Sequence, residues 1–117
     1  MSAAAPEPLV LRADDAQGVV TLTLNRGARF NPLSMEMIAA LQVEIDRIAD
    51  DAKARVVVLA GAGRGFCAGH DLKEMRSHGD DPAWGRKLFD DCSRMMLALT
   101  RLPQPVIARV HGIATAA

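Results

Sequence analysis

Residues 55–75, RVVVLAGAGRGFCAGHDLKEM, decide the fold of this 117-residue chain. The first six, Arg55 to Ala60, form an almost unbroken apolar and β-branched run, which is typical of a strand covered on both faces. Glycine then recurs between residues 61 and 69, where it lets the backbone bend and lets a ligand approach closely. Asp71 precedes a charged segment with helical spacing and is a candidate N-cap. The stretch therefore predicts a strand, a tight loop and a helix.

Three further segments read as strands. Residues 9–14 (LVLRAD) and 19–25 (VVTLTLN) flank a polar turn, so they predict a hairpin. Residues 106–110 (VIARV) predict another strand. In the loop that follows the hairpin, Pro32 favours an extended conformation for Asn31.

Two longer helices are expected on either side of the opening stretch. The first begins after Ser34 as N-cap, and its apolar residues recur at steps of three and four. A short helix over residues 72–75 follows Asp71. The last begins at about Pro82, because proline suits the first turn of a helix, and ends before Pro103. The order β-β-α-β-α-α-β predicts an α/β fold.

Composition argues against several classes of partner. Fourteen basic residues balance fourteen acidic ones, and Tyr is absent, so neither nucleic acid nor an anionic membrane surface is an expected partner. Half of the residues are hydrophobic, but no apolar run is long enough for a membrane span. The first ten residues, MSAAAPEPLV, lack the features of a signal peptide, so a cytoplasmic location is expected.

The two cysteines, Cys67 and Cys92, form no CxxC pair, and with the three histidines they show no zinc spacing. We therefore expect no metal site, and two reduced, mostly buried thiols in a reducing compartment.

The glycine loop lies where α/β proteins bind ligands, at the carboxyl end of a strand and before a helix N-terminus. Unpaired N–H groups there can bind an anionic oxygen. Residues 61–69 contain no G-x-x-x-x-G-K and no G-x-G-x-x-G, so the common nucleotide-phosphate motifs are excluded. On pattern alone, a glycine-rich connection capped by Asp71 explains the loop equally well.

Three motifs in order resemble one family. RGFCAGHDLKEM (64–75) closely resembles the F-x-x-G-x-D-[LI]-K-E-[ML] signature of the enoyl-CoA hydratase/isomerase, or crotonase, superfamily. VVTLTLNRGARFNPLSMEM (19–37) resembles its first hairpin and helix start, and LTRLPQPVIARVHGIATAA (99–117) its K-P-V-I-A-x-V-x-G strand. Within the superfamily, GHD with HGIATAA is most similar to the branch called enoyl-CoA hydratase domain-containing protein 3.

The resemblance implies the crotonase-like (ClpP/crotonase) fold of repeated ββα units. Residues 9–117 would form the N-terminal half of such a domain, incomplete at its C-terminal side, and residues 1–8 a flexible leader. Family chains are about twice this long and assemble as trimers or as dimers of trimers, so a homotrimer or hexamer is expected for the full-length protein.

The resemblance also implies the chemistry of the loop. Family members bind acyl-CoA thioesters, with coenzyme A as part of the substrate and no separate cofactor. They stabilise the enolate-like oxygen at the thioester carbonyl with two backbone N–H groups, which correspond here to those of His70 and Ala117. The glutamates that act as acid and base in family hydratases lie beyond residue 117, so this chain alone is expected to lack hydratase activity.

The resemblance implies further residues that would contact coenzyme A and the substrate. The carbonyl of Ala68 would meet the adenine of coenzyme A, and Arg29 is a candidate for its phosphates, although a solvated loop charge explains Arg29 equally well. The substrate-lining residues would be His70, Asp71, Leu72 and Lys73.

The chain departs from the family pattern at three places. His70 stands where many hydratases carry a small residue, so its imidazole could narrow the pocket or titrate in it. Ala116 and Ala117 replace glycines of the family's second oxyanion turn. Asp71 and Glu74 share a helix face and could form an acid/base pair, but capping and solvation explain them better.

The resulting prediction is an acyl-CoA-binding protein, most simply an enoyl-CoA hydratase or isomerase of fatty acid metabolism. The alternative is a non-enzymatic acyl-CoA-binding or regulatory member of the same fold. An RNA-binding interaction module is the third reading, which the balanced charge and the few aromatic residues disfavour.

Overall fold

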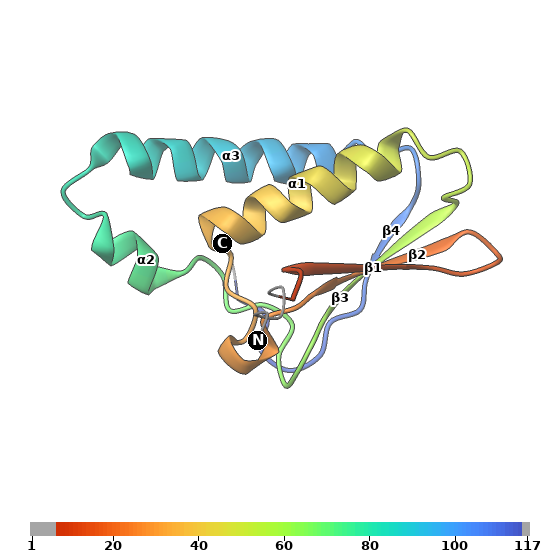
Figure 1. Cartoon of the computed structure of the whole chain (residues 1–117), viewed down its shortest axis with the longest axis horizontal. Coiled ribbons are helices and arrows are strands. Elements are labelled where there is room, and N and C mark those ends of the chain that lie inside the picture. The colour runs from red at the N-terminus through yellow and green to blue at the C-terminus, as the bar shows by residue number, and fades with distance from the viewer. Residues whose placement is uncertain (1–6, 116–117) are drawn as a thin grey trace, which may run out of the picture.

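The structure is a computed structural model that describes residues 7–115. Most of the expected leader therefore lies outside the described residues. The elements follow the predicted order, with one short 3-10 helix added (Figure 1). They are β1 (Val10–Asp14), β2 (Val19–Leu24), η1 (Gly27–Arg29), α1 (Met35–Ala49), β3 (Val56–Gly61), α2 (Leu72–Ser77), α3 (Pro82–Thr100) and β4 (Val106–Ala108).

The four strands form one sheet in the order β1-β2-β3-β4. β1 and β2 are antiparallel, which confirms the hairpin, whereas β3 and β4 run parallel to β2. In the hairpin turn, the Asp15 carboxylate accepts hydrogen bonds from the amides of Gln17 and Val19, at 2.8 and 2.9 Å. The parallel pairing brings the carboxyl ends of β2 and β3 to the same edge of the sheet, where the glycine loop begins.

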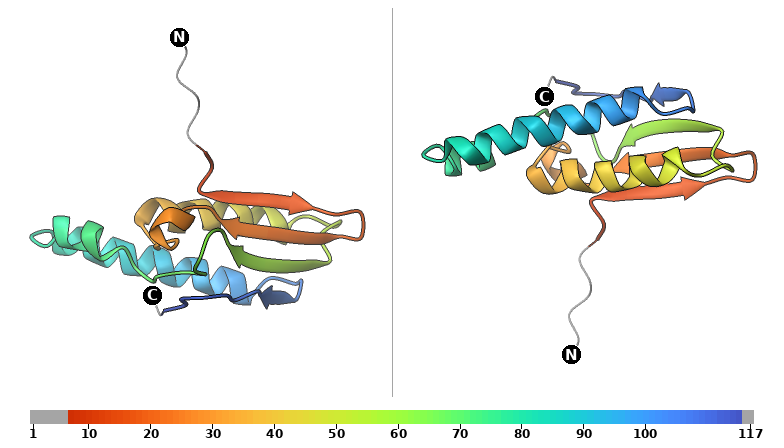
Figure 2. Two further views of the ribbon diagram at one scale, coloured as in Figure 1. Left: turned by 90° about the horizontal axis from the view of Figure 1, so that it is seen from below. Right: turned by 90° about the horizontal axis from the view of Figure 1, so that it is seen from above.

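Both long helices pack on one face of the sheet (Figure 2). α1 begins as predicted, because the Ser34 hydroxyl accepts a hydrogen bond from the Met37 amide at 3.1 Å. α3 begins with Pro82 after Asp81, whose carboxylate accepts from the Trp84 amide at 3.2 Å. The helices bury apolar stripes against the sheet, which consist of Met37, Ile38, Leu41, Ile45 and Ile48 in α1 and Leu88, Cys92 and Met95 in α3.

One burial prediction is wrong. β3 was expected to be covered on both faces, but only Val57 and Ala60 are buried, and Val56, Val58 and Leu59 are partly exposed. Among residues 7–115, helices cover one face of the sheet, so Val56 and Val58, which point to the other face, keep contact with solvent. Leu59 shares the helix face with Val57 and lines an apolar cavity there.

The conformation expected for Asn31 is also wrong. Its φ is +51°, in the left-handed region, and the preceding Phe30 has φ +61°. Asparagine tolerates this region better than most residues do. Its side chain is fully buried and hydrogen-bonded, and these contacts outweigh the preference that Pro32 imposes.

The β4 edge exposes apolar side chains. The strand ends at Ala108 rather than at residue 110. Ile107 is 55% exposed, and beyond the strand Val110 is 54% and Ile113 50% exposed. Three aliphatic side chains within seven residues are therefore half exposed or more at this end of the described chain.

The stripe of α1 predicts a sharp contrast between two substitutions. Ile45 is 1% exposed, whereas Val43, two residues away, is 47% exposed. We expect Ile45→Ala to lower the free energy of unfolding by about 2–5 kcal/mol, because it leaves a cavity in the core. Val43→Ala should change it by less than about 0.5 kcal/mol. Urea unfolding followed by circular dichroism measures both, and equal losses would contradict the assigned helix face.

A second prediction concerns Arg12 and pH. Its guanidinium lies 2.8 Å from Asp14 and 2.6 Å from Asp51. The hydrogen bond from Arg12 lowers the pKa of Asp14, and the Lys53 amide, followed by Arg12, lowers the pKa of Asp51. A lowered folded-state pKa adds stability above the unfolded value and loses it as pH falls through the folded value.

Arg12→Ala should therefore destabilise the protein at pH 7, and the difference from wild type should shrink between about pH 5 and pH 2. Arg101→Ala is the control, because Arg101 is exposed and forms no ion pair within residues 7–115. Thermal unfolding across this pH range measures the effect. A difference that is constant with pH would show that Arg12 acts only through packing.

Candidate active site

The glycine loop pairs on one side with the segment that precedes α1. The Ala68 amide donates to the Phe30 carbonyl at 2.8 Å, and the Leu33 amide donates to the Gly69 carbonyl at 2.7 Å. A longer contact of 3.4 Å joins the Asp71 amide to the Leu33 carbonyl. The backbone around residue 70 is thus held by main-chain bonds from a segment more than thirty residues earlier.

On its other side the loop pairs with the segment after β4. The Cys67 amide donates to Ile113 at 3.1 Å, and the Thr115 amide donates to Cys67 at 3.0 Å, which makes a short parallel bridge between Cys67 and Ala114. Residues 113–115 therefore advance in the same direction as the loop. Ala117 and Ala116, predicted to form the second oxyanion turn, lie outside the described residues.

These bonds determine where the His70 amide points. The peptide between Gly69 and His70 is trans, so its C=O and N–H point in opposite directions. The Gly69 carbonyl faces the Leu33 amide, and the His70 N–H therefore points away from Leu33. Within residues 7–115 no acceptor receives this hydrogen. Such an amide is available to an oxygen of a ligand.

Glycine is required where the loop meets the segment after β4. Gly112 has φ +61°, and a Cβ atom there would lie 2.2 Å from the Arg64 carbonyl oxygen. The neighbouring His111 donates from Nε2 to the Gly63 carbonyl at 2.7 Å, since a carbonyl can only accept. These contacts hold residues 111–112 tightly against residues 63–64, in the first part of the loop.

Asp71 and Glu74 act as caps. One Asp71 oxygen accepts from the Glu74 amide at 3.1 Å, and the other lies 3.5 Å from the Arg29 guanidinium. The Glu74 carboxylate accepts from the Met35 amide, in the first turn of α1, at 2.9 Å. Both carboxylates thus hold α2 in place, and the predicted cap at Asp71 is confirmed.

Three of the predicted binding residues share a surface hollow of about 470 Å³. Arg29, Asp71 and Lys73 line it together with Glu74, Ser77 and His78. Arg29 is 60% exposed there, so its charge is accessible to a soluble anion. Ala68 and Leu72 are exposed near these residues in the chain but do not line the hollow.

The His70 side chain faces a helix. Its ring packs edge-on against Phe89 of α3, with centroids 5.3 Å apart and planes at 83°. Its Nδ1 is buried and has no hydrogen-bond partner within residues 7–115. The backbone and the side chain of His70 therefore occupy different surroundings.

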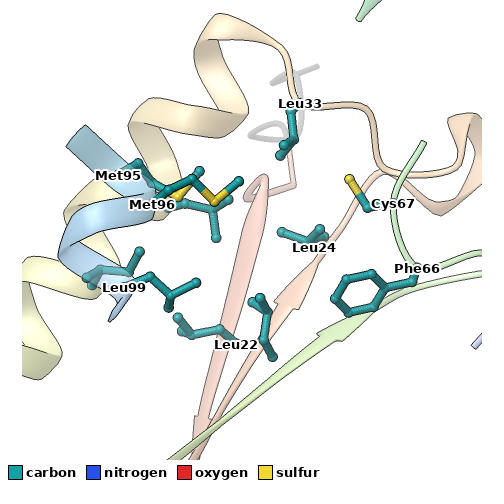
Figure 3. A pocket seen from close by; sticks show the side chains of 11 residues that line it. Leu22, Leu24, Leu33, Phe66, Cys67, Met95, Met96 and Leu99 are labelled. Carbon is teal, nitrogen blue, oxygen red and sulfur yellow. The ribbon is translucent and has the colours of Figure 1, made fainter. Parts of the chain in front are cut away.

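An apolar cavity of about 80 Å³ lies behind the loop (Figure 3). Phe66 and Cys67 face Met95, Met96 and Leu99 of α3 across it. Burial raises the pKa of the Cys67 thiol, against a smaller opposing effect of the Gly69 amide. Burial likewise raises the pKa of Cys92. Both cysteines are free and buried, as predicted, and as neutral thiols neither is an activated nucleophile.

Sequence reasoning missed Asn31. Its side chain has no exposed surface, and it accepts a hydrogen bond from the Arg26 amide at 2.7 Å. It also donates to three carbonyl oxygens of the glycine loop. The available signal was the residue type, because asparagine is enriched at positive φ and in turns.

Residues 7–115 lack two other features. No group of three or more His, Cys, Asp or Glu side chains is arranged to hold a metal ion. No helix in this range is both long and apolar enough to span a membrane.

Comparisons with known proteins agree with this geometry. The family model described as enoyl-CoA hydratase/isomerase matches residues 19–115. The chain is 40% identical over 101 residues to enoyl-CoA hydratase domain-containing protein 3, mitochondrial, of Xenopus laevis, covering 86% of this chain and 34% of that protein. It is 40% identical over 103 residues to 1,2-epoxyphenylacetyl-CoA isomerase of Escherichia coli strain K12, covering 86% of this chain and 39% of that protein.

A solved structure extends the agreement to three dimensions. The crystal structure of an enoyl-CoA hydratase of Mycobacterium smegmatis is 56% identical, with a TM-score of 0.86, over 92% of this chain and 42% of that one. The chain thus spans about a third of the length of the curated relatives quoted above. The chain has the N-terminal portion of the α/β crotonase fold. It belongs to the enoyl-CoA hydratase/isomerase, or crotonase, superfamily.

Proposed function

We propose that this chain binds acyl-CoA thioesters and stabilises an enolate-like oxygen at the thioester carbonyl. The observation that carries the proposal is the His70 amide, which points out of a loop held on both sides and donates to no acceptor within residues 7–115. An N–H already aimed at a developing negative charge lowers a barrier by roughly 2.7–4 kcal/mol. The Ala117 amide is the proposed second donor.

The coenzyme A portion would lie along the surface beside this amide. Arg29 and Lys73 bring two cations to the hollow next to Asp71, which suits phosphate groups. The exposed Ala68 would offer its carbonyl to the adenine, and the exposed Leu72 would contact the substrate. No other cofactor enters the proposal.

The proposed reaction of the whole protein is that of an enoyl-CoA hydratase or isomerase. Asp71 and Glu74, the carboxylates nearest to His70 in the chain, are already hydrogen-bonded in caps, so neither is a free base. By the resemblance to family hydratases, the proposed general base lies beyond residue 117. A homotrimer or hexamer in the cytoplasm is the form proposed for the full-length protein.

A specific observation also favours the alternative of a non-enzymatic acyl-CoA-binding or regulatory protein. The Asp71 and Glu74 carboxylates, which follow His70 in the chain, are held in hydrogen bonds at helix starts, and the hollow that they line with Arg29 and Lys73 carries two positive and two negative side chains. A chain with these parts alone could bind a thioester without transforming it. Activity distinguishes the two functions, since both require binding.

The first test is a titration followed by ¹H–¹⁵N NMR. Crotonyl-CoA should shift the His70 amide downfield, because the thioester oxygen accepts its hydrogen, whereas free coenzyme A should leave it unchanged. The same sample of residues 1–117 should not hydrate crotonyl-CoA, as judged by its enoyl absorbance. Perturbation of other residues without His70 would refute the oxyanion role. Hydration by this chain would refute the placement of the base.

The second test concerns Arg29. Arg29→Ala should weaken binding of coenzyme A by about threefold to tenfold through the loss of a phosphate contact, and the loss should shrink at high salt. Arg47→Ala is the matched control, because Arg47 is 67% exposed and paired with Glu44, but lies on α1 away from the hollow. Isothermal titration calorimetry measures both affinities. Equal affinities of the two variants for coenzyme A would show that Arg29 is a solvated loop charge that does not contact the phosphates.

A further inference from the structure

Asn31 closes the turn that leads from β3 to the His70 amide. Its Nδ2 donates to the carbonyl oxygens of Ala62, Gly65 and Phe66 at 3.0, 3.1 and 3.1 Å. The two hydrogens of this nitrogen are thus shared among three carbonyl oxygens, one from the start of the turn and two from its end. Because the Oδ1 atom is occupied by the Arg26 amide, the side chain cannot rotate without breaking all of these bonds.

The backbone beside Asn31 holds the next part of the same loop. Phe30 accepts from the Ala68 amide, and Leu33 donates to the Gly69 carbonyl. The four residues 30–33 therefore contact the loop from residue 62 to residue 69. The Asn31 side chain bonds to residues 62, 65 and 66, and the backbone of Phe30 and Leu33 bonds to residues 68 and 69. The Gly69–His70 peptide is the next unit along the chain, so its orientation depends on both sets of bonds.

We propose that Asn31 is a positioning residue that aims the His70 N–H at the thioester oxygen. This inference rests on the proposed function, because it concerns the same amide. Asn31 is fully buried, so its side chain does not reach the surface and acts only through the loop. Its loss should weaken recognition of the thioester oxygen and leave recognition of coenzyme A by the exposed Arg29 intact.

Neighbouring groups cannot replace the asparagine. A Cβ on Gly61 would lie 2.5 Å from the Phe66 carbonyl oxygen and 3.0 Å from Asn31 Nδ2, so no side chain fits there. Aspartate keeps the shape and tolerates positive φ, but it brings acceptor oxygens against three carbonyl acceptors. Glycine also tolerates positive φ and removes the side chain, which leaves the carbonyls without their donor.

These differences define the variants. Asn31→Asp and Asn31→Gly both remove the three donated bonds, and both residue types tolerate the positive φ of this position. Asn31→Asp keeps an acceptor for the Arg26 amide, whereas Asn31→Gly removes it. Asn25→Asp is the matched control, because Asn25 Nδ2 donates to Glu7 and Pro8, away from the loop. Each protein is titrated with crotonyl-CoA and, separately, with free coenzyme A, and the His70 amide and both dissociation constants are recorded.

In wild type and Asn25→Asp we expect crotonyl-CoA to bind more tightly than coenzyme A and to shift the His70 amide. In both Asn31 variants this advantage should fall by about threefold to tenfold and the His70 shift should diminish, while the affinity for coenzyme A stays within twofold. Equal His70 shifts in the Asn31 variants and wild type would overturn the inference and leave the proposed function standing. No His70 shift in wild type would instead overturn the proposed function.

Wild type supplies a measurement that does not depend on variants that fold. The two Nδ2 hydrogens of Asn31 should exchange slowly with solvent, and at rates similar to that of the Ala68 amide, because both groups donate hydrogen bonds between the same two segments and would be exposed by the same local opening. Fast exchange of the side chain beside a protected Ala68 amide would show that Asn31 does not hold the loop. The exchange rates are measured without ligand, so the result is independent of thioester binding.

Discussion

Main-chain pairing between residues 30–33 and residues 68–71 is the constraint on which the rest of the site depends. The first segment precedes the N-terminus of α1, the second follows the C-terminal end of β3, and neither is a regular strand. Polar backbone groups in such loops need partners when they are buried, and here each segment supplies partners to the other. The outward direction of the His70 amide follows from this pairing and from the trans peptide alone.

The same junction joins the helices to the sheet. Ser34 caps α1 directly after the paired segment, and Glu74 of α2 accepts a hydrogen bond from the first turn of α1. Asp71 caps α2 and contacts Arg29 in η1. Carboxylates at helix N-termini also interact favourably with the helix dipole, so the site and the helix starts stabilise each other. The two carboxylates that share a helix face in the sequence thus each accept a backbone hydrogen bond at a helix start.

Local patterns predicted most of the fold. The alternation in β2, the Ser34 cap and the stripe of α1 depend on neighbours within a few residues, and each is found in the structure. The burial of β3 was overestimated because an apolar run does not reveal how many faces are covered. Asn31 was missed for a similar reason, since its left-handed backbone is stabilised by carbonyls more than thirty positions away. Long-range hydrogen bonds leave no periodic signal.

The apolar surface at β4 and the proposed site share one physical origin. Ile113 is half exposed, yet its carbonyl accepts hydrogen bonds from both Phe66 and Cys67, so the same short segment supports the oxyanion loop and presents an aliphatic side chain to solvent. Protein packed against that side chain would press the 113–115 segment onto the loop. Because residues 66–67 are held from that side only by this segment, such packing would also steady the direction of the His70 amide.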